Sequence, residues 1–285
     1  MGRRTTRHPA VRHDFGPYAA ESGSASREIV TLAAEEPLEI RISGEPYVVT
    51  MRTPGDDMDL AAGYLVSEGA VWHRDHVPQI CYCTTVSGRT EQDFNTLTVS
   101  VSPDIPHPRQ RRAASMTSAC GVCGVDSIAE VETSSHFPMA PPVEDDPLLS
   151  AELLRELPDR MREAQKLFGK TGGVHAAALF AGSELLCLRE DVGRHNAVDK
   201  VVGWALREGR LPLTDTVLQV SGRASFELVQ KAAMAGIPVL SAVSAPSTLA
   251  VDLADRTGVT LAAFSRGDRV TVFTHQSRVS APGGS

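Results

Sequence analysis

From about residue 172 onward, short apolar segments alternate with longer amphipathic ones, and this pattern limits the possible fold more than any other feature. The apolar segments are predicted strands, at residues 174–180, 184–188, 216–220, 237–241 and 259–264. Predicted helices separate most of them, at about residues 196–207, 225–235 and 246–255. Strands that are apolar on both faces require helices on both sides of their sheet. The sequence therefore predicts an α/β core with three-layer α/β/α architecture over residues 150–277.

The first half of the chain has a different pattern. Residues 38–42 alternate apolar with polar side chains, a Gly-Glu-Pro turn follows, and residues 47–51 resume, which is typical of a β-hairpin. Asp56 and Asp57 stand where a helix begins, and residues 95–102 alternate as a strand does. Residues 27–136 are therefore predicted to form a smaller α+β unit.

Three segments are predicted to lie outside these units. Residues 1–26 are polar and without periodicity, which is typical of a disordered tail. Residues 137–149 are rich in proline and predict a linker, and residues 278–285 predict a second flexible tail. Ser150 is predicted to cap a helix that begins the α/β core.

Composition narrows the classes of function. The net charge of −7 argues against a nucleic-acid-binding protein. No apolar run approaches the roughly 20 residues that a membrane span needs, and the first residues lack the apolar stretch of an export signal. The five cysteines are an odd number, unlike the paired cysteines of secreted disulfide frameworks. We therefore expect a cytoplasmic protein with reduced thiols.

The loop Cys120-Gly-Val-Cys-Gly is the strongest candidate for chemistry. Gly121 and Gly124 leave its backbone free and keep bulk away from sulfur. A helix predicted to begin near Asp126 would lower the pKa of a nearby thiol and favour the nucleophilic thiolate. Cys120 and Cys123 are therefore candidate sulfur-carrying residues.

The other cysteines leave alternatives open. Cys81 and Cys83 would have to complete a four-cysteine zinc site with this loop, although their one-residue gap is tighter than the usual spacing. Cys187 lies between leucines and is predicted to be a core residue. A pair of inert buried cysteines is the third alternative for the loop.

Motifs after the loop complete a family pattern. They are Gly172-Gly-Val-His-Ala-Ala-Ala, Glu190-Asp-Val-Gly-Arg-His-Asn-Ala-Val-Asp-Lys, Ser221-Gly-Arg-Ala-Ser-Phe-Glu and Phe264-Ser-Arg-Gly-Asp-Arg. Together with Cys120-Gly-Val-Cys-Gly, in this order over roughly residues 28–275, they resemble the FdhD family of formate dehydrogenase accessory sulfurtransferases. The combination is far more specific than a lone Cys-x-x-Cys.

The resemblance implies a sulfur carrier. It would accept persulfide sulfur from a cysteine desulfurase and deliver it to the molybdenum (or tungsten) bis-guanine-dinucleotide cofactor of a formate dehydrogenase catalytic subunit. The cofactor is then a bound substrate, and the protein itself needs no metal ligands. By position in the motif, Cys120 matches the persulfide-forming cysteine and Cys123 its helper. The resemblance also implies a homodimer and a core related in fold to cytidine deaminases.

The candidate cofactor-binding residues come from two sources. The resemblance maps the family's cofactor-binding segment onto residues 264–269 and favours ligand binding at two loops that lie at the ends of predicted strands, where open α/β sheets bind ligands. They are Gly193, Arg194 and His195, then Ser221, Gly222 and Arg223, and finally Phe264, Ser265, Arg266, Gly267, Asp268 and Arg269. Junctions between strand and helix offer free N–H groups for phosphate, and arginine can bind phosphate oxygens in a fork. Capped helix starts, and a plain turn at 266–268, are the structural alternatives. His175, on an apolar strand, is predicted to be a hydrogen-bonded core histidine.

A chaperone that binds the cofactor without carrying sulfur is the main alternative function. The sequence leaves open which metal the client uses, which protein donates sulfur, what Cys81 and Cys83 do, and whether Cys123 is essential.

Overall fold

The computed structural model describes residues 3–15, 24–83, 94–106, 135–143 and 147–281, and its main element is a six-stranded mixed sheet. The strand order is β13-β12-β11-β10-β8-β9, and the middle strands β10, β11 and β12 are parallel. The bounds are β8 His175–Ala181, β9 Glu184–Asp191, β10 Val217–Val220, β11 Val239–Ala242, β12 Thr260–Arg266 and β13 Arg269–Val272. All five strands predicted from the sequence are present.

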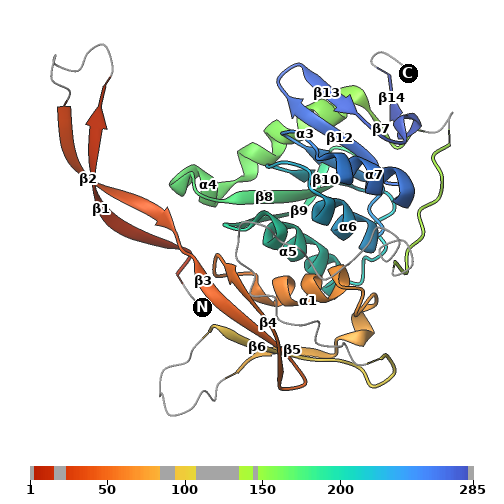
Figure 1. The fold of residues 1–285 in the computed structure, drawn as a ribbon, viewed down its shortest axis with the longest axis horizontal. Helices are drawn as coiled ribbons and strands as arrows, with labels where there is room; N and C mark the ends of the chain where they lie inside the picture. The colour runs from red at the N-terminus through yellow and green to blue at the C-terminus, as the bar shows by residue number, and fades with distance from the viewer. Residues whose placement is uncertain (1–2, 16–23, 84–93, 107–134, 144–146, 282–285) are drawn as a thin grey trace.

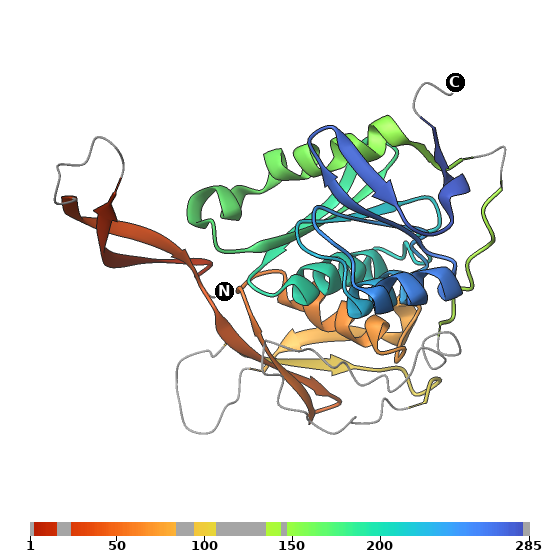
Figure 2. The ribbon, with the colours of Figure 1, turned by 45° about the horizontal axis from the view of Figure 1, so that its top comes forward.

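Helices cover both faces of this sheet (Figures 1 and 2). One face carries α3, Ala151–Ala164, and the other carries α5, Arg194–Arg207, with α6, Phe226–Met234, and α7, Thr248–Thr257. Along β8, Ala176 and Phe180 belong to the buried cluster beneath α3, whereas Ala177 and Leu179 belong to the cluster beneath α5. This alternation follows from the two-residue period of a strand. The α/β prediction is confirmed, and the likeness to cytidine deaminases stays a prediction.

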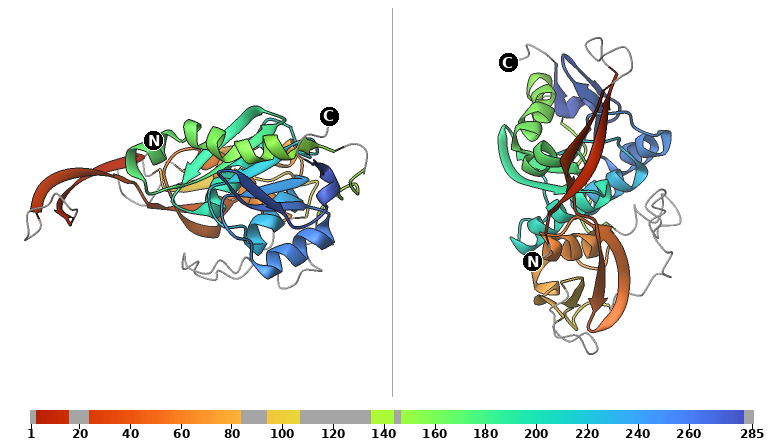
Figure 3. Two further views of the ribbon diagram at one scale, coloured as in Figure 1. Left: turned by 90° about the horizontal axis from the view of Figure 1, so that it is seen from above. Right: turned by 90° about the vertical axis from the view of Figure 1, so that its left-hand side faces the viewer.

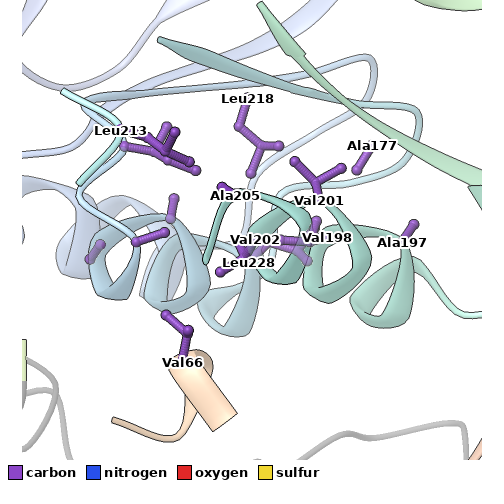
Figure 4. Close-up of a cluster of buried hydrophobic side chains, with 14 of the residues drawn as sticks. Val66, Ala177, Ala197, Val198, Val201, Val202, Ala205, Leu213, Leu218 and Leu228 are labelled. Atoms are coloured by element: carbon purple, nitrogen blue, oxygen red, sulfur yellow. The ribbon is translucent and has the colours of Figure 1, made fainter. Parts of the chain in front are cut away.

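The N-terminal unit adds a second sheet and packs closely on the core. Its strand order is β4-β3-β6-β5, with β3 Glu36–Ile42, β4 Glu45–Arg52, β5 Gln79–Tyr82 and β6 Thr96–Ser100. Helix α1, Asp57–Ser67, lies between this sheet and α5 (Figure 2). One continuous hydrophobic cluster joins Leu38 of β3 to Leu218 of β10, and Figure 4 shows Val66 of α1 in this cluster with labelled side chains of α5 and α6. The two predicted units therefore share one core.

The prediction of a disordered tail over residues 1–26 is wrong for residues 5–14 and 24–26. Thr5–Asp14 forms β1, which pairs in antiparallel register with β2, Ser24–Ala33. This hairpin projects from the body of the molecule (Figures 1 and 3) and contacts it near α4, Lys166–Thr171. Most side chains of both strands face solvent, and most of them are polar. The sequence therefore lacks the alternation of apolar and polar residues by which a half-buried strand is recognised.

The C-terminal tail also differs from its prediction. Val279–Ser280 forms β14, which pairs with β7, Leu149–Ser150. Arg278, the residue that precedes β14, is buried. The predicted cap is confirmed, since the Ser150 hydroxyl accepts a hydrogen bond from the Leu153 N–H at 3.2 Å. In the predicted proline-rich linker 137–149, residues 137–143 contain no helix or strand, and Leu149 already belongs to β7. No helix in the described part of the chain is long and apolar enough to cross a membrane.

Candidate functional site

Cys120 and Cys123, the predicted sulfur-carrying residues, lie outside the described residues. The four-cysteine zinc alternative involves them and is therefore untested. The described cysteines are free: Cys81 is exposed on β5, and the Cys83 sulfur lies 2.9 Å from the Thr98 hydroxyl. Cys187 is buried, and burial raises its pKa to about 12, so this thiol stays protonated at neutral pH. Its predicted place in the core is confirmed.

Two of the predicted ligand-binding loops lie at one edge of the large sheet. Residues 221–223 follow β10, residues 193–195 follow β9, and the first residue of β8 lies between the two strand ends. The Ser221 hydroxyl accepts a hydrogen bond from the Ala176 N–H at 2.9 Å. A Cβ added to Gly222 would lie 3.5 Å from Nδ1 of His175, so that imidazole packs directly against the glycine.

Asp191, the last residue of β9, holds the start of α5. Its carboxylate accepts a hydrogen bond from the Gly193 N–H at 2.8 Å and lies 2.7 Å from Nζ of Lys200. Both charged side chains are fully buried, so the pair is a fixed support for the helix terminus. Within this motif, Val192, Gly193, Arg194 and His195 are the partly exposed residues, and the charged side chains among them are candidates for contact with a ligand.

His195 faces a carboxylate to which the sequence assigned no role. Its Nε2 lies 3.8 Å from Oε2 of Glu227, near the start of α6. Burial alone would raise the pKa of Glu227, but interactions with His195 and with the Glu227 backbone outweigh burial and lower that pKa to about 2. Glu227 is therefore ionised at neutral pH. It brings a negative charge close to the loops 193–195 and 221–223, in which the sequence analysis had named Arg194 and Arg223 as phosphate-binding candidates.

A bulge divides the predicted cofactor segment 264–269. Phe264 has a φ of 53°, and its N–H donates to a carbonyl of the loop after β11 at 3.2 Å. The Ser265 side chain is buried, and its hydroxyl donates to a carbonyl of α3 at 3.4 Å. Arg266 is exposed at the end of β12, and Gly267, with a φ of 58°, makes the predicted turn to β13. Phe264 and Arg266 are therefore more accessible to a ligand than Ser265 is.

A cleft of about 580 Å³ lies between these strand ends and the elbow where α3 meets α4. From the strand side it is lined by Val174, His175, Val192, Ser221, Val243 and Arg266. From the helix side it is lined by Pro158, Asp159, Met161, Arg162, Gln165 and Phe168, and Gly172 and Gly173 complete the wall. Ser221 and Arg266 thus line the same cleft, and their role in binding a cofactor stays a prediction.

Sequence reasoning missed the helix side of the cleft. Residues 151–168 have the apolar spacing of an ordinary surface helix, and nothing in that spacing distinguishes a polar side chain in a cleft from one in solvent. The prediction of His175 as a hydrogen-bonded core residue also differs from its position, because this half-buried ring lines the cleft. Burial and the nearby Arg194 and His195 lower the pKa of His175, so its imidazole is neutral at pH 7.

A larger cavity of about 740 Å³ lies beneath the proline-rich segment, near the starts of β10 and β11. Its lining includes Pro212, Asp215 and Pro238, which precede these strands. Open α/β sheets bind their ligands beyond the carboxyl ends of the parallel strands. The smaller cleft is therefore the candidate site.

Comparison with known proteins gives one consistent result. A profile of the FdhD/NarQ family matches residues 33–280. "Sulfur carrier protein FdhD" of Streptomyces avermitilis is 50% identical over 285 residues, covering 98% of this chain and 97% of that protein. The Mycobacterium tuberculosis protein of the same name is 50% identical over 281 residues, covering 96% and 99%. A crystal structure described as a formate dehydrogenase accessory protein from Desulfotalea psychrophila superposes with a TM-score of 0.73 at 26% identity, covering 98% of this chain and 100% of that one.

Proposed function

The chain belongs to the FdhD/NarQ family, and on this basis we propose that it is a sulfur carrier in the maturation of a formate dehydrogenase. The observation that carries the proposal is the 50% identity to proteins named as sulfur carriers over nearly the whole of both chains. We place its action in the cytoplasm, where a reduced thiol can act as nucleophile.

The proposed first step is a persulfide exchange. The Cys120 thiolate attacks the terminal sulfur of a cysteine desulfurase persulfide, and the desulfurase thiolate leaves. One S–S bond forms and one breaks, so the step needs no added oxidant or reductant. Cys123 is the candidate to resolve or protect the persulfide on Cys120. Delivery of the outer sulfur to the bound bis-guanine-dinucleotide cofactor as a sulfido ligand would take up two electrons, because persulfide sulfur is more oxidised than sulfide. The Cys123 thiolate would supply them by attacking Cys120, so that the S–S bond of the persulfide breaks, a Cys120–Cys123 disulfide forms and sulfide is released to the cofactor.

The proposed docking site for that cofactor is the cleft with the loops beside it. Arg266 lines the cleft, and Arg194 and Arg223 belong to the neighbouring strand-end loops. Guanidinium groups bind phosphate in a bidentate fashion, and the N–H groups at the start of α5 favour anions. These features support a ligand that carries phosphate groups, as the nucleotide arms of the cofactor do.

We propose a homodimer in which the β1–β2 hairpin contacts a second copy of this chain. An isolated two-stranded hairpin is at best marginally stable in water, yet this one exposes Val11 by 55% and Ile29 by 69%. Its exposed cationic residues include Arg7, Arg12 and Arg27, whereas the whole chain has a net charge of −7. The two hairpin strands also contain Asp14 and Glu28, so their net charge is only +1, and Arg12 already pairs with Glu28 at 3.2 Å. The exposed apolar side chains of the hairpin are therefore the main support for this interface.

Sedimentation tests this arrangement. We expect the wild-type protein to be a dimer and the double variant Val11→Asp, Ile29→Asp to be a folded monomer. Val49→Asp is the control, because Val49 is also 55% exposed but lies on β4. A wild-type monomer, or a double variant that remains dimeric, would show that the hairpin does not hold two copies together.

Intact-mass spectrometry tests the carrier function. The full-length protein is incubated with a cysteine desulfurase and cysteine, alongside Cys120→Ala, Cys123→Ala and the exposed-thiol control Cys81→Ala. We expect wild type and Cys81→Ala to gain the mass of one sulfur atom and Cys120→Ala to gain none. No gain by the wild type would favour a chaperone that binds the cofactor without carrying sulfur.

A further inference from the structure

A glutamine at the α3–α4 elbow has a buried amide nitrogen without a partner. Gln165 is 6% exposed and lines the cleft. Among the described residues, its Nε2 has no hydrogen-bond partner. Buried polar groups are nearly always paired, because a donor that loses water without a replacement destabilises the fold. A polar atom of a ligand in the cleft would supply the missing acceptor.

The elbow is held in place by a buried carboxylate. Glu190 of β9 is 5% exposed and accepts hydrogen bonds from the Leu167 N–H at 2.8 Å and the Phe168 N–H at 2.7 Å. These bonds fix the first turn of α4, directly after Gln165. The amide is therefore presented by a rigid support, and a rigid donor loses little conformational freedom when a ligand binds.

The same wall of the cleft carries a flat stacked pair. The guanidinium carbon of Arg162 lies 3.8 Å from the centre of the Phe168 ring, and both residues line the cleft. Guanidinium and aromatic planes are surfaces on which planar heteroaromatic rings stack. Asp159 adds a hydrogen-bond acceptor to this wall, and Arg266 adds positive charge from the strand side.

The unpaired Gln165 amide, the stacked Arg162 and Phe168 and the Asp159 carboxylate together fit a planar base that carries a ring carbonyl beside N–H groups. Of the two common purines, guanine has an acceptor oxygen at position 6, whereas adenine has an amino donor there. The Gln165 amide nitrogen at this position can donate a hydrogen bond to the 6-oxo group of guanine, whereas the amino group of adenine offers it no acceptor. A neighbouring carboxylate accepts from the ring N–H and amino groups of guanine.

We propose that Gln165 determines base specificity in this cleft, its Nε2 donating to the 6-oxo group of a purine that lies against Arg162 and Phe168. The inference rests on the proposed function, since the nucleotide arms of the cofactor end in guanine. It adds the elbow residues Asp159, Arg162, Gln165 and Phe168, which lie outside the strand-end motifs, to the binding site.

Calorimetric titration of the full-length protein with GDP, inosine diphosphate and ADP tests the proposal. We expect GDP and inosine diphosphate, which share the 6-oxo group, to bind more tightly than ADP. Gln165→Leu removes the amide at similar volume and should weaken GDP binding about tenfold, the typical effect of one hydrogen bond. Gln230→Leu is the control, because Gln230 is also buried, at 3% exposure, but lies on α6 outside the lining of the cleft.

A second variant separates recognition from a purely structural role. Gln165→Glu keeps the shape but replaces the donor with an acceptor, so we expect it to weaken GDP binding and to strengthen ADP binding. A change in stability alone would weaken both nucleotides together. Circular dichroism of each variant checks that it is folded.

The outcomes distinguish this inference from the proposed function. If the wild type binds GDP and both Gln165 variants bind it equally well, the inference is overturned while cofactor binding stands. If the wild type binds none of the three nucleotides, nucleotide recognition in this protein is refuted, and the inference fails with it. Sulfur loading of Cys120 is measured separately and is unaffected by either result.

Discussion

Gly63 of α1 and Gly203 of α5 lie face to face at the closest approach of two helices. A Cβ built on Gly63 would overlap the carbonyl oxygen of Asp199, and one built on Gly203 would overlap that of Asp59. The overlapping atoms belong to the backbone and cannot rotate away. This crossing joins the N-terminal unit to the core, so the small size of both residues determines how the two pack.

Gly63→Ala should therefore destabilise the protein, although alanine favours helix more than glycine does. Forcing a methyl group into packed backbone typically costs about 1–3 kcal/mol or more. Gly169→Ala in α4 is the matched control, because nothing lies within 4 Å of its added Cβ, and it should be neutral or slightly stabilising. Urea unfolding measures both, and equal stabilities of the two variants would contradict the packing argument.

Asp191→Asn tests the ion pair beneath the start of α5. The substitution leaves Lys200 buried without a counter-charge, and breaking a buried pair in this way typically costs about 3–5 kcal/mol. Glu156→Gln breaks the exposed pair with Arg160, in which both side chains are 44% exposed, and should cost less than about 1 kcal/mol. The free energy of unfolding of each variant is measured with urea. A loss for Asp191→Asn no larger than that for Glu156→Gln would mean that the buried pair is dispensable for stability.

The low pKa of Glu227 predicts a pH dependence of stability. This carboxylate has a pKa of about 2 in the folded protein against an ordinary value of 4.5, so it stabilises the fold above pH 4.5 and ceases to do so as pH falls towards 2. Glu227→Gln should be less stable than wild type at pH 6, with a smaller difference at pH 3. Adding His195→Gln to this variant should lower the free energy of unfolding little further, because His195 has already lost the Glu227 carboxylate that it faces.

The thiols should differ in reactivity with a thiol reagent. Cys81 is exposed and should react in the folded protein, whereas Cys187 is buried with a pKa of about 12 and should react only after unfolding. Mass spectrometry after peptide digestion identifies the modified residue. Rapid modification of Cys187 under native conditions would mean that β9 opens readily.

Local patterns were sufficient for the core. Apolar strands of the large sheet, the Ser150 cap and the turn at Gly267 each depend on residues that are close in sequence, so periodicity and turn chemistry predict them. The same pattern placed the loops at 193–195 and 221–223 at the carboxyl ends of strands that lead into helices. Their ligand-binding role and the segment 264–269 rest on the family pattern. The sulfur-carrying role of Cys120 and Cys123 rests on the family pattern.

Tertiary structure decided what depends on distant residues. The β1–β2 hairpin has no apolar alternation and is formed by backbone pairing, so its sequence does not reveal it. Gln165 and Ser221 belong to one cleft because α3 crosses the sheet and ends above the ends of its central strands. Periodicity reports which side of an element is buried, whereas the position of one element over another depends on packing between residues that are far apart in the chain.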